Sequence, residues 1–195
     1  MAASSLRIFL AGATGVIGSR LLPLLLAEGH SIAAMTRTPA KLDQLRTSGV
    51  TPLLCDLFDR SALIQTVVDF RPDVILHQVT DLPDEGSKIA EFRARNQRVR
   101  SEGTSNLLAA SQATHARSVV AQSIAWSGGP VVDAHEQTVS AAGGTVLRYG
   151  QFYGPDTYYP NELPAHPRIH VDVAATRTME FLIDRPGVFT LVDSE

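Results

Sequence analysis

Three glycines stand three residues apart, at Gly12, Gly15 and Gly18, between an apolar run and a leucine-rich segment of helical character. In a strand, turn and helix unit such glycines permit a tight turn, leave room for a pyrophosphate and let the helix pack closely on the strand. The amide groups at the start of the helix then face the anion. The spacing is G-x-x-G-x-x-G rather than the commoner G-x-G-x-x-G, but the elements on both sides favour a dinucleotide-binding turn.

The end of the second apolar run indicates which dinucleotide to expect. Residues 30–36 predict a strand that ends at Thr36, Arg37 follows directly, and Lys41 lies one turn later. At this place an acidic side chain binds the ribose of NAD, whereas an arginine accommodates the additional phosphate of NADP. No acid stands there. The sequence therefore favours NADP over NAD, with a solvated surface arginine as the alternative.

A further polar residue follows the next predicted strand, residues 51–55. Parallel strands end at one edge of a sheet, where the cofactor lies, so Asp56 is a candidate ligand of the adenine amino group. A loop carboxylate without a ligand is the alternative. Asp59, three residues on, is expected to cap the next helix.

The order of apolar runs predicts the elements that position these residues. Strands are expected at residues 6–11, 30–36, 51–55, 74–76, 117–122, 145–148 and 187–192, and helices at residues 19–29, 39–46, 60–70, 87–114, 131–142 and 169–184. Residues 149–168 are expected to be loop. This alternation predicts an α/β fold with a doubly wound parallel sheet, the Rossmann fold, that binds its ligand at the carboxyl edge.

Composition limits the classes of partner. The chain has 195 residues, 44% of them hydrophobic and 19% charged, and a net charge of −3. These values predict a globular protein with no general attraction to nucleic acid or anionic membranes, so the expected partners are a small-molecule substrate and a second copy of the chain. Without about 20 consecutive apolar residues, no membrane span is expected. The single cysteine, Cys55, excludes an internal disulfide and fits a reducing, cytoplasmic location.

Other chemistry is not supported. The six histidines are scattered, and Pro167 prevents a helix from aligning His166 with His170, so no metal site is predicted. His170 is instead expected to organise a strand-to-helix corner with Asp172. No G-x-S-x-G motif surrounds Ser123, which argues against a hydrolase. The arginines at positions 93, 95, 98 and 100 are flanked by glutamates and are expected to form a solvated helix face.

The motifs, in this order, resemble the extended and atypical branches of the short-chain dehydrogenase/reductase superfamily, of the NAD-dependent epimerase/dehydratase type. The matches run nearly the whole length: GATGVIG, CDL, DVILHQV, NQRVRSEGTSNLLAAS, VVAQSIAW, LRYGQFYGP and HVDVA. The resemblance implies that the pyrophosphate is held by Thr14, Gly15, Val16 and Ile17, the adenosine phosphate by Arg37, the adenine by Asp56 and Leu57, and the adenosine side by His77, Gln78 and Val79. It also implies that Tyr149, Gly150 and Gln151 lie beside the nicotinamide and that Ser123 occupies the position of the catalytic serine or threonine.

Two departures from this family bear on catalysis. The proton relay of a tyrosine followed four residues later by lysine is missing, because the only lysines are Lys41 and Lys88. The region where the relay belongs is compressed to residues 127–137, so either this is a compact branch or a loop near Ser127 and Gly128 is absent from the sequence. We expect one domain over residues 1–195, with residues 155–195 as a vestigial substrate-binding portion.

Two functions remain open. The first is an NADP-dependent oxidoreductase or epimerase-like enzyme that reduces a small carbonyl with NADPH, in which Ser123 binds the substrate oxygen and Tyr153 acts as the acid. The second is a non-catalytic NAD(P) sensor. The superfamily also implies a homodimer formed through the helices at residues 87–114 and 131–142. Leu107, Leu108 and Val139 are candidate contacts, and the alternative is that they cover the sheet.

Overall fold

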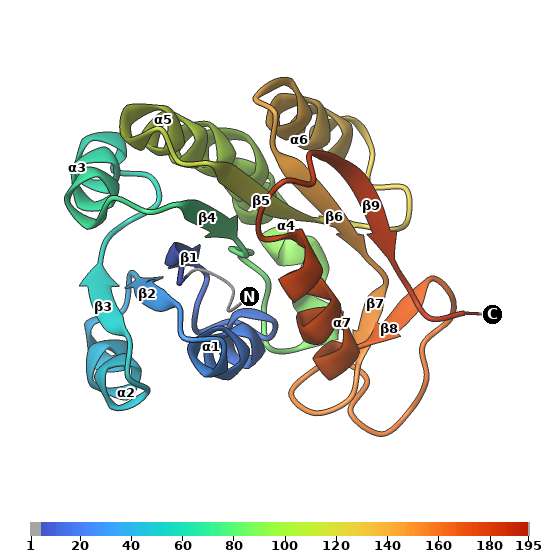
Figure 1. The fold of residues 1–195 in the computed structure, drawn as a ribbon. Helices are drawn as coiled ribbons and strands as arrows, with labels where there is room; N and C mark the ends of the chain where they lie inside the picture. Colours follow the sequence, from blue (N-terminus) through green and yellow to red (C-terminus); the bar gives the residue numbers. More distant parts are fainter. Residues whose placement is uncertain (1–4, 195) are drawn as a thin grey trace.

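The computed structural model describes residues 5–194 and has three layers, with a parallel sheet between two layers of helices (Figure 1). The sheet has seven strands in the order β3-β2-β1-β4-β5-β6-β9, and every pairing is parallel. The strands are β1 (Arg7–Ala11), β2 (Ser31–Thr36), β3 (Thr51–Leu54), β4 (Val74–His77), β5 (Ser118–Ile124), β6 (Thr145–Tyr149) and β9 (Gly187–Leu191). The chain order reverses beside β1, which confirms the predicted doubly wound Rossmann sheet.

Helices cover both faces of the sheet (Figure 1). One face carries α1 (Gly18–Ala27), α2 (Leu42–Thr47) and α7 (Val171–Thr178), and the other carries α3 (Arg60–Phe70), α5 (Thr104–Thr114) and α6 (Pro130–Ala141). The helix α4 (Ile89–Arg98) precedes α5, and short 3-10 turns occupy Pro39–Lys41, Gly86–Lys88 and Met179–Phe181.

Each face of the sheet has its own apolar core. In β1, Ile8 and Leu10 point toward α1 and α7, whereas Phe9 and Ala11 point toward α3 and α5. Strands covered on both faces need apolar side chains at every position, which is why the strands appear in the sequence as continuous apolar runs. Cys55 is buried in the second core.

The predicted long helix over residues 87–114 is present from Ile89 to Thr114, but it contains a π-helical turn that the sequence did not predict. A π-helical turn, Val99–Gly103, separates α4 from α5. At this turn Gly103 packs so closely on Leu57 that an added Cβ would lie 2.5 Å from a Leu57 methyl carbon. Periodicity alone does not reveal such a turn, because the apolar positions continue through it.

The segment predicted to be loop contains two strands. β7 (Gln151–Tyr153) and β8 (Arg168–His170) form a separate two-stranded parallel sheet. The helix expected from residue 169 begins only at Val171, because His170 is its cap and accepts a hydrogen bond from the Asp172 amide at 3.3 Å. The predicted role of His170 at the strand-to-helix corner is thereby confirmed.

The last elements of the chain belong to the Rossmann core. α7 packs on α1, and β9 pairs with β6 at the edge of the sheet. The buried side chains of Val171, Phe181 and Leu191 join the first core. Much of the segment that the sequence assigns to substrate binding, residues 155–195, therefore also holds the fold together.

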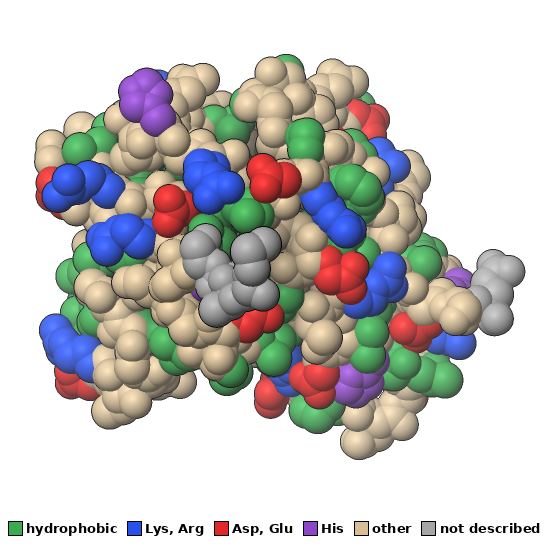
Figure 2. Space-filling model, viewed as in Figure 1, with side chains coloured by type: hydrophobic (Ala, Val, Ile, Leu, Met, Phe, Trp, Pro, Cys, Tyr) green, Lys and Arg blue, Asp and Glu red, His purple; other side chains and the backbone are tan. Residues whose placement is uncertain are grey.

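Charges of both signs are interspersed on the face seen in Figure 2. Arg98 pairs with Glu102 at 2.7 Å, and Arg95 pairs with Asp81 at 3.0 Å. Among residues 5–194, every helix is too short or too polar to cross a lipid bilayer.

Candidate functional site at the carboxyl edge of the sheet

The residues predicted to bind the cofactor follow the carboxyl ends of consecutive strands. Because the strands are parallel, these ends meet at one edge of the sheet. Gly12 follows β1, Arg37 follows β2, Asp56 and Leu57 follow β3, His77 ends β4, and Tyr149 ends β6.

The three glycines of the turn between β1 and α1 differ in what requires them. Gly12 has φ of +90°, and a Cβ there would lie 2.5 Å from the Gln78 backbone. A Cβ at Gly18 would overlap the carbonyl oxygen of Gly12. Gly15 is exposed, and its Cβ would lie 3.4 Å from the Gly12 oxygen, an ordinary contact. Packing within the chain therefore explains Gly12 and Gly18 but leaves the glycine at position 15 unexplained.

The turn also has amides without partners. The amide of Gly15 donates to the Gly12 carbonyl at 3.0 Å, whereas those of Thr14, Val16 and Ile17 donate to no protein acceptor within residues 5–194. Unpaired amides beside the start of a helix are suited to bind an anion. The turn thus has the donors and the space that a pyrophosphate requires.

Two cations lie beside this turn. The Lys41 ammonium group is 3.4 Å from the Thr14 hydroxyl. The Arg37 side chain is 58% exposed, with its nearest carboxylate oxygen, on Asp81, 3.6 Å away. Asp81 itself is held mainly by Arg95. Two cationic side chains, Arg37 and Lys41, therefore lie at the carboxyl edge beside the glycine turn.

Of the two predicted residues after β3, Asp56 forms a turn and Leu57 packs in the apolar core. An Asp56 carboxylate oxygen accepts from the Phe58 amide at 2.9 Å and closes a turn, and the carboxylate remains exposed. Leu57 is buried, so only its backbone can face a ligand. Asp59 caps α3 by accepting from the Ala62 amide at 3.0 Å, as predicted. A cavity of about 720 Å³, lined partly by Asp56, Phe58 and Arg98, lies next to this turn.

The side chain of His77 ties β4 to α5 and α6. Its Nε2 is 3.1 Å from the Thr104 hydroxyl, which is 2.9 Å from His135 Nδ1. The His135 Nε2 faces the Gln122 carbonyl at 3.0 Å and must donate to it. Burial lowers the pKa of His77 to about 3, so the ring is neutral. The His77 imidazole is therefore part of the interface between helices and sheet.

The other two predicted residues after β4 are also enclosed. The side-chain amide of Gln78 is buried, and neither its nitrogen nor its oxygen has a hydrogen-bond partner by geometry within the described residues. The carbonyl oxygen of Val79 accepts a hydrogen bond from the side-chain Nε2 of Gln122 at 3.3 Å.

Ser123 lies within β5 and is bonded to a carboxylate. Its hydroxyl donates to Glu136 at 2.5 Å, and Arg148 donates to the same carboxylate through Nε and Nη2. Burial would raise the pKa of Glu136, but the hydrogen bonds from Arg148 and Ser123 leave it lowered. The one hydroxyl proton of Ser123 is used in the hydrogen bond to the Glu136 carboxylate. In this arrangement Ser123 can therefore accept a hydrogen bond from a substrate but cannot donate one.

The predicted tyrosines also have partners elsewhere. The Tyr149 hydroxyl is 2.7 Å from the Thr178 hydroxyl in α7, and burial raises the pKa of Tyr149 to about 12. The Tyr153 ring packs edge-on against His170 at 5.1 Å, and a hydrogen bond with Asp193 raises its pKa. Within residues 5–194 no hydrogen bond joins Ser123 to Tyr153. The roles of both in catalysis stay predictions.

The two residues after Tyr149 occupy a narrow place between strands. A Cβ on Gly150 would lie 2.7 Å from the Arg168 Cα, which requires glycine. The Gln151 side chain donates to the Ala165 carbonyl at 2.9 Å.

Sequence reasoning missed the partners that hold these residues. Arg148 is the one charged residue of the apolar strand β6, which is a signal that it has a charged partner, but nothing in the sequence identifies Glu136 as that partner. Thr104 and His135 gave no signal, because each looks like an ordinary helix residue. Arg20, the single charged side chain in the leucine-rich run of α1, is a signal of the same kind.

The profile of the NAD dependent epimerase/dehydratase family matches residues 8–150. The chain belongs to this family. The given sequence contains no tyrosine that is followed four residues later by a lysine.

A relative in the NAD dependent epimerase/dehydratase family is a Streptomyces protein named 3-diazoavenalumate denitrifying reductase. The two are 34% identical over 185 aligned positions, which cover 80% of this chain and 60% of that protein. The chain thus spans about three fifths of its relative's length. The alignment has 185 positions, but 80% of the 195 residues of this chain is fewer than 185. The alignment therefore contains gaps in this chain, where the relative has additional residues.

Solved structures share the fold of this family member. The UDP-glucose 4-epimerase of Thermus thermophilus, in complex with NAD, superposes with a TM-score of 0.78 at 20% identity, over 97% of this chain and 78% of that one. The UDP-N-acetylglucosamine 4-epimerase of Bacillus cereus has a TM-score of 0.71 at 19% identity, over 98% and 79%. At these identities the likeness establishes the fold.

Proposed function

We propose that this chain binds NADP(H) at the turn between β1 and α1 and uses it to reduce a small electrophilic substrate. The observation that carries the proposal is the combination at this turn of a glycine that packing does not require, Gly15, with unpaired amides and two cations, Arg37 and Lys41. No acidic residue follows β2 to select NAD. Binding of NAD in a neighbouring structure agrees with a dinucleotide at this edge.

The direction of the reaction follows from the side chains that can exchange protons. NADPH supplies a hydride when it is bound. Tyr149 and Tyr153 have raised pKa values, so both phenols are neutral near pH 7 and neither can act as a base. The Ser123 hydroxyl donates its proton in a hydrogen bond to Glu136 and so has no proton free to donate to a substrate. These groups disfavour oxidation of alcohols, which requires a base, and favour reduction.

The same groups favour substrates whose reduction needs little proton transfer. The Streptomyces relative is named for a denitrifying reduction of a diazo compound. When a hydride replaces a diazonium group, a C–H bond forms, the C–N bond breaks and dinitrogen leaves with the bonding electrons, so no proton has to be delivered. A chain without the tyrosine and lysine relay could perform this type of reduction.

Three exposed apolar side chains lie in the loops after β4, β5 and β7. Leu82 follows β4, Trp126 follows β5 and Tyr158 follows β7, with exposed fractions of 39%, 43% and 38%. The Tyr158 hydroxyl donates to the Pro83 carbonyl, which brings the loops after β4 and β7 together. These side chains suit an apolar or aromatic substrate.

The test is NADPH consumption with a panel of aromatic diazo acids, quinones and aldehydes. We expect reduction of at least one class, with no corresponding alcohol oxidation near pH 7. Gly15→Val, which would fill the space beside the turn, is the control that should lose consumption. Tight NADPH binding without consumption across the panel would refute the reductase and support the non-catalytic sensor, which the commitment of Ser123 to Glu136 also favours.

A further inference from the structure

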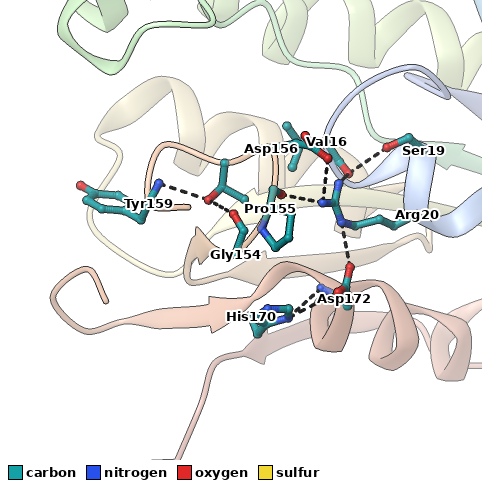
Figure 3. Close-up of polar contacts among 10 residues, drawn as sticks. Val16, Ser19, Arg20, Gly154, Pro155, Asp156, Tyr159, His170 and Asp172 are labelled. Carbon is teal, nitrogen blue, oxygen red and sulfur yellow. Dashed lines mark hydrogen bonds and ion pairs between the residues drawn. The ribbon is translucent and has the colours of Figure 1, made fainter. Parts of the chain in front are cut away.

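Arg20, in the first turn of α1, joins three segments that are far apart in the sequence (Figure 3). Its Nε donates to Asp172 at 2.8 Å, at the start of α7. Its Nη1 donates to the Val16 carbonyl in the glycine turn at 2.9 Å. Its Nη2 donates to the Pro155 carbonyl at 2.5 Å and to the Asp156 carboxylate at 3.2 Å. The side chain is only 15% exposed.

The contact with Val16 bears on the predicted phosphate site. The Val16 carbonyl is held by Arg20 and also by the Ser19 hydroxyl at 3.2 Å. In a trans peptide the carbonyl and the following amide point in opposite directions. Holding the Val16 oxygen toward Arg20 therefore turns the Ile17 amide away from Arg20, and this amide has no acceptor within the described residues.

The other contacts fix the loop between β7 and β8. Within this loop the Gly154 amide donates to the Tyr159 carbonyl at 3.0 Å. Gly154 also packs on His170, where a Cβ would lie 2.6 Å from the ring nitrogen. The loop thus has local order, but the link to the glycine turn runs through Arg20 (Figure 3).

Arg20 also balances charge. Asp156 and Asp172 have side chains that are 82% and 61% exposed, and Arg20 is the guanidinium within 4 Å of both. Without Arg20, two carboxylates would stand uncompensated beside a turn that is proposed to bind a doubly charged pyrophosphate. Repulsion between these carboxylates and a bound anion would weaken anion binding, although water would screen part of it.

We propose that Arg20 is a positioning residue that couples the dinucleotide turn to the 154–159 loop, so that cofactor binding orders the loop that carries Tyr158. This inference deepens the proposed function and rests on it for its cofactor part. The coupling acts through the Val16 peptide on one side and through Pro155, Asp156 and Asp172 on the other.

The test is hydrogen–deuterium exchange of Arg20→Met, measured with and without NADPH. Without cofactor, we expect the 154–159 loop to exchange faster in Arg20→Met than in the wild type. With NADPH, the wild type should gain protection in both the 12–18 turn and the loop, whereas Arg20→Met should gain it only in the turn. Arg46→Met is the matched control, because Arg46 is an exposed arginine paired with a single carboxylate, Asp43.

Affinity separates the charge effect from the positioning effect. We expect Arg20→Met to weaken NADPH binding about fivefold to tenfold. Adding Asp172→Asn should restore part of this affinity by removing repulsion, without restoring protection of the loop. Unchanged loop exchange in cofactor-free Arg20→Met would overturn the coupling, whatever the cofactor does. If NADPH protects nothing in the wild type, the proposed function fails, and with it the cofactor part of this inference.

Discussion

At the scale of single residues, the three glycines of the turn between β1 and α1 have different roles: two are required by the fold, and the third is explained by the proposed ligand. Gly12 and Gly18 have no room for a side chain within the protein, whereas Gly15 has room and is exposed. A glycine that the fold does not need has to be explained by something outside the chain. The proposed pyrophosphate supplies that explanation.

Gly15→Ala should therefore retain the fold and lose the ligand. Its φ is not in the left-handed region, so we expect a free energy of unfolding within about 0.5 kcal/mol of the wild type, and NADPH affinity lower by at least about tenfold. Gly18→Ala should instead lower stability by about 2 kcal/mol or more, because the new methyl group overlaps the Gly12 oxygen. Urea unfolding and calorimetric titration of both variants measure this difference. A Gly15→Ala protein that binds NADPH normally would show that the turn is not the anion site.

Residue types could be predicted from the sequence better than residue partners. The glycine spacing, Arg37 and the capping roles of Asp59 and His170 depend on neighbours within a few positions. Ser123 is hydrogen-bonded to Glu136 and Tyr149 to Thr178, and these partners lie 13 and 29 residues away in the sequence. No local pattern fixes such long-range hydrogen bonds, so the sequence could place these hydroxyls at the edge but not identify their partners.

At the scale of elements, a series of buried side-chain hydrogen bonds joins β4, α5 and α6. His77, Thr104 and His135 are each at most 3% exposed. Burial lowers the pKa of both rings. When His135 is neutral and its Nε2 donates to the Gln122 carbonyl, its Nδ1, which also lies 3.3 Å from the Arg100 carbonyl, accepts from Thr104, and Thr104 accepts from His77 Nε2. Both rings must be neutral for this arrangement to hold.

These buried hydrogen bonds make the free energy of unfolding fall as the pH falls. The pKa of His77 is about 3 in the folded protein and the ordinary value is 6.5. Between these values the unfolded chain binds more protons, so the stabilisation present above pH 6.5 is lost as the pH falls toward 3. At pH 5 the loss from His77 is on the order of 2 kcal/mol, and the lowered pKa of His135 acts in the same direction.

Chemical denaturation at pH 7 and pH 5 tests this dependence. His77→Gln, which keeps a donor for Thr104, should lose less stability between the two pH values than the wild type by about 2 kcal/mol. His115→Asn is the control, because His115 is exposed and caps α5 in a left-handed conformation that asparagine tolerates. Equal pH dependence in wild type and His77→Gln would contradict a neutral, buried His77.

The elements that sequence periodicity missed are short or irregular. β7 and β8 have three residues each, which is too few for an alternating pattern to be recognised. The π-helical turn at Val99–Gly103 keeps the helical appearance of its neighbours. Long apolar strands and amphipathic helices, by contrast, were predicted to within a few residues.

At the scale of the whole molecule, the compact chain still completes its sheet. β9 closes the edge beside β6, and α7 covers the face beside α1. The homodimer stays a prediction, but its proposed contacts are wrong, since Leu107, Leu108 and Val139 are at most 8% exposed and cover the sheet. A partner copy would have to meet the outward faces of α5 and α6.

The central claim, an NADP(H) site at the carboxyl edge, is tested most directly by calorimetric titration of the chain with NADPH and with NADH. A charge-assisted bond between Arg37 and the ribose phosphate is worth roughly 1.5–3 kcal/mol, so NADPH should bind about ten- to a hundredfold more tightly. Arg37→Ala should remove most of this difference and leave NADH affinity nearly unchanged. Equal affinities for the two cofactors in the wild type, or no binding of either, would contradict the account.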